Sequence, residues 1–450
     1  MLRLFDTAKG EVVPLELREP GKVSIYACGP TVYGPPHLGH GRNTLSYDIL
    51  RRYLAWLGND VTFVSNVTDI DDKIIKRALD EDRPWEAIVE RCEAVWFRGM
   101  DALGIERPDQ SPHATDYVKQ MVALIERLVD DGAAYETSDG VYFSAESVPD
   151  YGALAGQPIE SLKAGARIEA NEEKRSPIDF VLWKKAKPGE PTWDSPWGPG
   201  RPGWHTECVV MSLDLLGDGF DVHGGGLDLR FPHHENERAQ AVADGHRFAA
   251  HWFHNGMLEI DGEKMSKSLG NVRNLIDLVE EWDPRAFRLL ILRSHYRSPM
   301  DISDESLRDT RAAVGRLDAF ARRVASLDLP SPDSASVDAF RTAMDDDLDT
   351  PRAVALIFDL VRRANAALDA GEAVAAAPLA AAVLDLTAAL GLAIGGAADE
   401  VPADVADLAR QRDAARAAKD WAAADALRDR LQADGWTIED TPHGTEVRRA

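Results

Sequence analysis

The stretch that decides the fold is Val23-Ser24-Ile25-Tyr26-Ala27, followed by Cys28-Gly29-Pro30 and then by His37-Leu38-Gly39-His40. The first five residues form a short apolar run rich in β-branched side chains, which predicts a buried strand that Gly29-Pro30 ends. Residues 37–57 then predict a helix, and residues 61–64 predict a second buried strand. Such a strand, helix and strand are the unit of a parallel α/β sheet, whose ligands bind beyond the carboxyl ends of the strands. We therefore expect residues 28–40 to lie where a ligand binds.

The whole chain has 450 residues, which is too long for a single hydrophobic core, so we expect several domains. We expect an α/β fold: a Rossmann-like parallel-sheet domain in two halves, residues 1–107 and 204–255, separated by an insertion at 108–203. Residues 303–395 predict a helical bundle, because Ser303 can cap a helix and apolar residues then recur at helical spacing. These residues are Leu307, Val314, Leu317, Ala321 and Val324. After a linker at 395–400, residues 402–450 predict a small mixed domain with a helical pair and a hairpin.

Composition narrows the class of protein. The chain has no apolar run of the roughly 18 residues that a membrane span needs, and its first six residues lack the apolar core of a signal peptide. We therefore expect a cytoplasmic protein. The three cysteines, Cys28, Cys92 and Cys208, are too few and too scattered for a disulfide framework, which leaves them available as thiolate ligands.

The formal net charge of −25 by itself speaks against a nucleic-acid partner. Binding is local, however, and basic residues gather at 184–187 and along 410–430. Solvated protein surface is the alternative interpretation of both clusters.

The motif His37-Leu38-Gly39-His40 lies at a predicted strand-to-helix junction. A helix N-terminus offers unpaired amides and the positive end of the helix dipole, and two histidines three apart share one face of the first turn. Gly39 leaves room for a flat base or sugar to approach. Such a group suits a phosphate that gains charge during nucleotidyl chemistry, although a pair of surface or capping histidines remains the alternative.

The motif Lys264-Met265-Ser266-Lys267-Ser268 has two lysines three apart among small hydroxyl side chains. Lysine is a flexible point charge suited to a leaving pyrophosphate. An exposed turn is the alternative for this motif alone, and its pairing with the first motif across more than 200 residues is what favours phosphate chemistry.

Cys28, Cys208, His233 and Glu237 form a third candidate group. His233 and Glu237 are four apart and therefore share a helix face, whereas the two cysteines are far apart in sequence, unlike the tight pairs of zinc fingers. From spacing alone, the alternative is that the cysteines are inert and buried, beside a polar helix face. The neighbouring residues Ala94-Val95-Trp96-Phe97 indicate that Cys92 is such a core cysteine.

The segment Gly224-Gly225-Gly226-Leu227-Asp228 lies between a predicted strand at 220–223 and the helix of His233. The glycines would let the backbone approach a nucleotide, and Asp228 could accept hydrogen bonds from ribose hydroxyls.

Together the two motifs resemble the signature sequences of class I aminoacyl-tRNA synthetases. Four further stretches, residues 26–33, 65–73, 203–208 and 231–237, resemble the cysteinyl-tRNA synthetase family, as does Ala343 to Pro351. The similarity runs over essentially the whole chain.

The resemblance implies that the chain activates L-cysteine with ATP to cysteinyl-adenylate, releases pyrophosphate and transfers cysteine to tRNA(Cys). It implies one Zn²⁺ per subunit, and Mg²⁺ that enters with ATP. By the family pattern the catalytic residues are His37, His40, Lys264 and Lys267; the ATP-binding residues are Gly39, Gly226, Asp228 and Lys267; the cysteine-binding residues are Gly29, Thr68, Trp204 and His205; and the zinc ligands are Cys28, Cys208, His233 and Glu237. His223 and His234 would belong to the surroundings of this pocket.

The resemblance also assigns roles to the expected domains. Residues 108–203 would be the connective insertion, 256–302 the signature-loop and stem-contact region, and 402–450 the anticodon-binding domain of a monomeric enzyme. Arginines at 410, 412, 416, 428, 430, 448 and 449, with Trp436 stacking on a base, would suit single-stranded loop RNA.

Two alternatives stay open. A mycothiol-type cysteine ligase, which joins cysteine to an amino-sugar, would share the ATP and zinc sites but needs no anticodon reader. A catalytically silent tRNA-binding paralogue should have lost a signature lysine or histidine, and none is missing.

Overall fold

The structure is a computed structural model that describes residues 1–165, 173–260, 263–265, 272–395, 403–441 and 444–449. The chain divides into two compact units. The first holds residues 1–315 and 327–392, and the second holds residues 316–326 and 393–450. Among the helices of the described residues, none combines the length and the apolar character needed to cross a bilayer.

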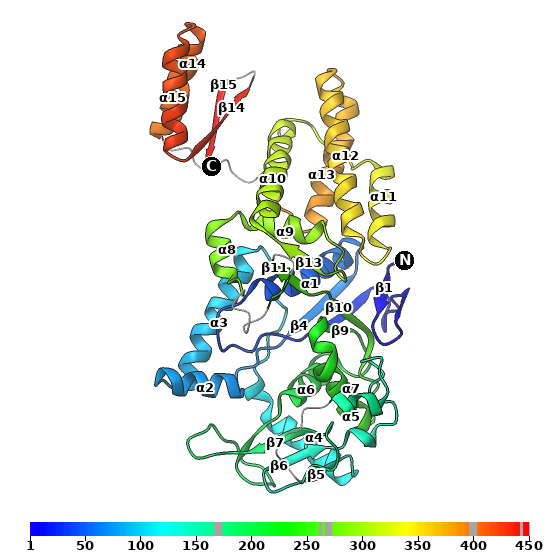
Figure 1. The fold of residues 1–450 in the computed structure, drawn as a ribbon. Coiled ribbons are helices and arrows are strands. Elements are labelled where there is room, and N and C mark those ends of the chain that lie inside the picture. Colours follow the sequence, from blue (N-terminus) through cyan, green and yellow to red (C-terminus); the bar gives the residue numbers. More distant parts are fainter. Residues whose placement is uncertain (166–172, 261–262, 266–271, 396–402, 442–443, 450) are drawn as a thin grey trace. The chain divides into compact units, whose positions relative to one another are not determined.

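A four-stranded parallel sheet lies at the centre of the first unit (Figure 1). Its strands follow the order β10 (Ala249–Asn255), β9 (Phe220–Gly226), β3 (Lys22–Ala27) and β4 (Asp60–Ser65). Five of the six residues of β3 are buried, as expected for a parallel strand covered on both faces. Helix α1 (Leu38–Trp56) connects β3 to β4, and α6 (Trp204–Leu216) packs against β3. The predicted strand–helix–strand unit and the α/β class are therefore confirmed.

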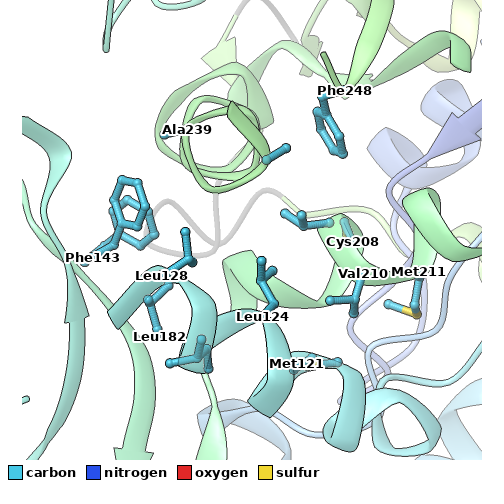
Figure 2. Close-up of a cluster of buried hydrophobic side chains, with 14 of the residues drawn as sticks. Met121, Leu124, Leu128, Phe143, Leu182, Cys208, Val210, Met211, Ala239 and Phe248 are labelled. Atoms are coloured by element: carbon cyan, nitrogen blue, oxygen red, sulfur yellow. The ribbon is translucent and has the colours of Figure 1, made fainter. Parts of the chain in front are cut away.

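The segment between the two halves of the sheet has its own structure. It contains α4 (Val118–Asp130), α5 (Ile159–Gly165) and an antiparallel sheet in the order β5 (Ala134–Glu136), β6 (Gly140–Phe143), β7 (Phe180–Lys185) and β8 (Gly200–Pro202). Figure 2 shows the apolar core that joins this segment to α6: Met121, Leu124 and Leu128 of α4 belong to the same cluster as Cys208, Val210 and Met211. The core therefore sets the position of the helix that carries Cys208.

The remaining elements of the first unit surround this sheet. They are β1 (Arg3–Asp6), β2 (Glu11–Pro14), α2 (Asp72–Glu81), α3 (Trp85–Ala102), α7 (Glu235–Ala243), α8 (Leu275–Glu281) and α9 (Pro284–Leu292). A small sheet has the order β12 (Glu263–Lys264), β11 (Leu258–Ile260) and β13 (Met300–Ile302). Its hairpin of β11 and β12 leads into the second motif.

Helices follow from Asp304, as predicted. They are α10 (Asp304–Val324), whose last turns belong to the second unit, α11 (Ser334–Met344), α12 (Thr350–Asp369) and α13 (Ala373–Ala389). Ser303 accepts a hydrogen bond from the amide of Ser306, so the predicted cap is present. All five apolar residues predicted for one face of α10 are buried.

The second unit contains α14 (Ala403–Ala417), α15 (Trp421–Ala433) and an antiparallel hairpin of β14 (Trp436–Thr441) and β15 (Gly444–Arg449). Its own small core includes Val405, Leu408, Leu431 and Trp436. The helical pair and the hairpin are as predicted. The exact domain boundaries given above stay a prediction.

Candidate functional site: a buried Cys₂HisGlu cluster beside two histidines

Four side chains from distant parts of the chain meet at the carboxyl end of β3. The ligand atoms of Cys28, Cys208, His233 and Glu237 all lie within 4.8 Å of one another, and all four residues are buried. Cys28 follows β3 directly, and Cys208 lies on α6. Two sulfur atoms, an imidazole nitrogen and a carboxylate oxygen are a donor set that zinc accepts. This part of the chain can therefore hold a metal ion.

Short contacts join the members of the cluster. Cys28 Sγ lies 3.5 Å from Cys208 Sγ and 3.4 Å from Glu237 Oε1. His233 Nε2 lies 2.7 Å from Glu237 Oε1 and 3.7 Å from Cys208 Sγ. The predicted pairing of His233 with Glu237 across one helical turn is present, although His233 lies in a short π-turn before α7.

Burial and charge act together on these groups. Burial raises the pKa of the Cys28 thiol well above its usual value. Burial acts in the same direction on Cys208, but the hydrogen bond from Cys28 and the charge of His233 hold its pKa at about 7. Burial opposes the charged form of His233, yet the neighbouring Glu237 carboxylate raises its pKa to about 10. A metal cation would replace the proton on His233 as the positive charge beside Glu237.

Residues around the cluster orient its members. His205 Nδ1 lies 2.8 Å from His233 Nδ1, and the Trp204 ring stacks on His233 with centroids 4.0 Å apart. His223 Nε2 lies 2.5 Å from Glu237 Oε2, while its Nδ1 lies 2.9 Å from the carbonyl oxygen of Tyr26. Because that carbonyl can only accept, Nδ1 of His223 carries a proton. Imidazoles and carboxylates around a metal ligand set are the usual means of fixing ligand orientation.

His234 lies in the surroundings of this cluster, where the family pattern places it. With Cys28, His223 and Glu237 it forms a second set of possible ligand atoms. Its Nδ1 lies 2.7 Å from His254 Nε2, and burial lowers the pKa of His234 well below its usual value. The two sets share Cys28 and Glu237, so they describe one dense cluster rather than two separate sites.

Asn66 and Glu207 are the two residues that sequence reasoning missed. The amide of Gly29 donates to Asn66 Oδ1 over 2.9 Å, and Asn66 Nδ2 donates to Thr68 Oγ1 over 3.2 Å. Thr68 in turn donates to Glu207 Oε2 over 2.6 Å, and burial raises the pKa of Glu207 well above its usual value. Both residues lie in stretches that resemble the family, at 65–73 and 203–208, and this was the signal available in the sequence.

The four residues expected to bind cysteine thus lie around the cluster. Gly29 has no room for a side chain, since a Cβ there would lie 1.6 Å from the carbonyl oxygen of Asn66. Thr68 is buried, and Trp204 and His205 contact His233.

The first motif forms the start of α1. His37 is the N-cap residue, and its backbone amide donates to His40 Nδ1 over 3.1 Å. The two imidazoles stack with centroids 3.6 Å apart. Because His40 Nδ1 accepts this bond, a neutral His40 ring carries its proton on Nε2. A cavity of about 180 Å³ lies beside them, lined in part by Pro30, Tyr33, Arg77, Trp96 and Asn274.

The second motif is described only in part. Lys267 lies outside the described residues. The backbone of Lys264 lies in β12, and its side chain is outside the description. Met265 connects the motifs: a Cβ added at Gly39 would lie 3.0 Å from Met265 Cε. The two motifs, far apart in sequence, therefore meet at the first turn of α1.

The glycine triplet lies elsewhere than expected. Gly224, Gly225 and Gly226 are the last residues of β9 rather than a connection after the strand. A Cβ at Gly224 would lie 1.7 Å from the carbonyl oxygen of Phe253, so packing within the sheet requires that glycine. Asp228 follows in a short 3₁₀ turn and is exposed.

Two predictions for the terminal unit are wrong. Trp436 is only 8% exposed and packs in the core of that unit, so it cannot stack on an RNA base. Arg412 is also buried, and its Nη1 donates to Thr445 Oγ1. Trp421, at 60% exposed, is the aromatic side chain at the surface of this unit. Arg410 and Arg428 each lie 3.1 Å from an aspartate on their own helix.

Family models and curated relatives match the chain over its whole length. Residues 14–312 match the family model of the class I (C) tRNA synthetase catalytic domain, residues 339–394 match the DALR domain, and residues 398–448 match the cysteinyl-tRNA ligase anticodon-binding domain. A cysteine–tRNA ligase of Halorhodospira halophila is 48% identical over 459 residues, and cysteine–tRNA ligase 1 of Photobacterium profundum is 44% identical over 467 residues. In both cases 100% of each chain is covered.

The fold has solved relatives. Mycobacterium tuberculosis methionyl-tRNA synthetase bound by methionyl-adenylate has a TM-score of 0.64 at 17% identity, over 87% of this chain and 94% of that chain. A leucyl-tRNA synthetase complex of Agrobacterium radiobacter has a TM-score of 0.65 at 12% identity, over 84% of each chain. With full-length relatives at such identity and three consecutive family models, the chain belongs to the cysteinyl-tRNA ligase family of class I aminoacyl-tRNA synthetases.

Proposed function

We propose that the chain is a cysteine–tRNA ligase. The carboxylate of L-cysteine attacks the α-phosphate of ATP to give cysteinyl-adenylate and pyrophosphate, and a terminal ribose hydroxyl of tRNA(Cys) then displaces AMP. The full-length likeness to cysteine–tRNA ligases supports this activity. The observation that carries it is the buried cluster of Cys28, Cys208, His233 and Glu237 next to the first motif.

The donor set of this cluster fits one Zn²⁺ per chain, since thiolate, imidazole and carboxylate are all zinc ligands. A zinc ion held by these four residues would supply a Lewis-acid partner for the thiolate of the substrate, which serine could not match because its hydroxyl is far harder to ionise. Cysteine and serine differ little in shape, and a pocket that relied on shape alone would separate such analogues poorly. The donor set thus explains how the chain can select cysteine.

The chain's own residues complete the pocket. Trp204 and His205 hold the His233 ring from two sides, and His223 holds Glu237. Asn66 binds the amide of Gly29 and lies 3.7 Å from Cys208 Sγ. These contacts fix the side chains before substrate arrives, which lowers the entropic cost of binding.

We assign ATP activation to the two motifs. His37 and His40 lie at the amide-rich N-terminus of α1, where a phosphate gaining charge is stabilised by the dipole and by imidazole donors. Lys264 and Lys267 would meet the leaving pyrophosphate with its Mg²⁺. Gly39, Gly226 and Asp228 would contact the adenosine. No protein nucleophile is needed, because positioning and electrostatics lower the barrier.

The acceptor is tRNA rather than an amino-sugar. The match of residues 398–448 to an anticodon-binding domain supports this choice, because a ligase acting on an amino-sugar has no anticodon to read. The relatives that cover the whole chain are likewise cysteine–tRNA ligases.

The test is ATP–pyrophosphate exchange driven by cysteine, with serine as the matched control, followed by acceptor assays with tRNA(Cys) and with an amino-sugar. We expect exchange with cysteine, little with serine, and transfer to tRNA alone. Exchange with cysteine but transfer only to the amino-sugar would establish the alternative ligase. Equal exchange with both amino acids would remove the thiol-selecting role of the cluster.

A further inference from the structure

Arg42 is a buried cation in the first turns of α1. It lies two residues after His40, and its side chain is only 1% exposed. The guanidinium donates to backbone carbonyl oxygens: to Met257 over 2.6 Å, to Tyr296 over 3.2 Å and to Ser298. Burial lowers its pKa to about 10. An arginine held by neutral carbonyls in the interior is costly, so its position calls for a reason beyond packing.

The three carbonyls belong to two segments that lie side by side at the base of the small sheet. The amide of Gly256 donates to the carbonyl of Tyr296 over 2.8 Å, and Met300 donates to the carbonyl of Met257 over 3.2 Å. A Cβ at Gly256 would lie 2.5 Å from the carbonyl oxygens of both Arg297 and Ser298. Arg42 therefore joins two tightly packed segments, because its planar guanidinium donates hydrogen bonds to both of them at once.

This junction leads directly to the second motif. Strand β11 starts at Leu258 and pairs antiparallel with β12, where Glu259 lies opposite Lys264. Arg42 thus connects the helix that begins with His37 and His40 to the strand pair that contains Lys264. The contact is made within one and a half turns of the two histidines.

A second set of bonds fixes the chain after the motif. Leu38 donates to the carbonyl of Arg273 over 3.1 Å, and Leu275 donates to the carbonyl of Pro36 over 2.8 Å. Asn274 forms a β-bridge with His37. The start of α1 is therefore bonded on both sides of the motif. The Arg42 side chain bonds to Met257, the residue before β11, and backbone hydrogen bonds join α1 to residues 273–275 after the motif.

We propose that Arg42 is a positioning residue for adenylate formation. Its guanidinium holds the β11–β12 pair in place relative to the first turn of α1, so that Lys264 and the two histidines act on the same phosphates. This inference rests on the proposed function. Electrostatic catalysis depends on such alignment, and a displacement of about 1 Å can cost on the order of 10²-fold in rate.

The test compares Arg42→Met and Arg42→Lys with Arg288→Met. Arg288 is the matched control: it is also 1% exposed and also donates to backbone carbonyls, but it pairs with Asp48 and its carbonyl acceptors are Leu103, Gly104 and Leu390 rather than those of the junction. Gly256→Ala perturbs the same junction from its other side. All variants are compared at a temperature at which each remains folded, with zinc content measured in parallel.

For Arg42→Met we expect kcat of cysteine-dependent exchange to fall by about 10²-fold, with KM for cysteine changed by less than about twofold and zinc content unchanged. Arg42→Lys keeps the positive charge and N–H donors but lacks the planar guanidinium that reaches both segments, so its kcat should lie between those of wild type and Arg42→Met. Gly256→Ala should lower kcat in the same way. Arg288→Met should lose thermal stability and keep near-normal kcat. Hydrogen exchange at residues 256–260, 263–265 and 296–300 should quicken in the Arg42 variants and not in Arg288→Met.

Equal loss of kcat in Arg42 and Arg288 variants of equal thermal stability would overturn the proposal, since it would mean that only stability was lost. A rise in KM alone would overturn it too. If Arg42→Met does not fold, Arg42→Lys and Gly256→Ala decide the question by the same kinetic criterion. Failure of the proposed function shows separately, as absent cysteine-dependent exchange in the wild type, and the hydrogen-exchange comparison then still tests the junction.

Discussion

Replacing Cys208 by serine tests the proposed metal site most directly. The change removes one sulfur from the cluster and adds no bulk, and the surrounding fold has no reason to move. The Cys208 side chain is 1% exposed, with its Sγ 3.5 Å from Cys28 Sγ and 3.7 Å from His233 Nε2. The pKa of Cys208 is about 7, so it supplies a thiolate near neutral pH, which a serine hydroxyl does not.

The expected loss follows from the size of the ligand set. Zinc held by four such ligands binds with about 10–16 kcal/mol. If each ligand contributes about a quarter, the loss of one costs about 3 kcal/mol, which is on the order of 10²-fold in affinity. Cysteine-dependent exchange should fall with the zinc content, because the substrate thiol loses its binding partner.

The assay is zinc competition with a chromophoric chelator, combined with elemental analysis after dialysis. Cys92→Ser is the matched control: Cys92 is also buried, at 4% exposure, but it lies in a separate core with Ile88 and Val89. Both variants carry the cost of a buried hydroxyl, which is about 1–3 kcal/mol of stability, so only the zinc affinity should separate them.

Two results would refute the reasoning. If Cys208→Ser binds zinc as tightly as Cys92→Ser, Cys208 is not a ligand. If zinc is lost but the preference for cysteine over serine in exchange is unchanged, the metal does not select the thiol.

Three further changes address the motifs and the terminal unit. Lys267→Ala should lower the rate constant of exchange much more than the affinity for ATP, because its charge acts mainly in the transition state; wild-type turnover would contradict this. Trp421→Ala should weaken tRNA charging and leave exchange intact, because this exposed ring can stack on a base. Trp436→Ala should instead destabilise the terminal unit, because this ring is buried in its core. Equal melting curves and equal charging in both variants would speak against this distinction. Removing the chain after Glu400 should preserve exchange and impair charging, since the residues after it have their own core of Val405, Leu408, Leu431 and Trp436. Parallel loss of both activities would instead indicate a stabilising cap.

The first strands and the first helix of the parallel sheet could be predicted from the sequence. The strand around Ile25, the helix after His37 and the strand around Phe63 all form within two residues of their predicted bounds. Periodicity carries this information, because the spacing of apolar residues reports which face is buried. The bundle from Ser303 was predicted on the same basis, whereas the terminal hairpin was predicted from the turn sequence Pro442-His443-Gly444.

The site was predicted by resemblance and not by spacing. Cys28 and Cys208 are 180 residues apart, and only the assembled sheet brings their sulfur atoms to 3.5 Å. Pattern alone likewise misassigned Trp436 and Arg412, because amino-acid type does not tell a buried aromatic or guanidinium from an exposed one. Asn66 was missed for a related reason: it lies in a stretch that resembles the family, but residue type does not show that its side chain bonds to Gly29 and Thr68.

The packing of the insertion bears on the chemistry of the site. Cys28 belongs to the first half of the sheet domain, and the other three cluster residues belong to the second half. The apolar core in Figure 2 places α4 of the insertion against α6, and so sets the position of Cys208 relative to β3. Interiors packed at crystal-like density transmit a change of even one methylene to their neighbours. A smaller side chain at Leu124 is therefore expected to shift α6 and, with it, Cys208. If the proposed function holds, the insertion thus affects the selection of cysteine through the position it gives to that helix.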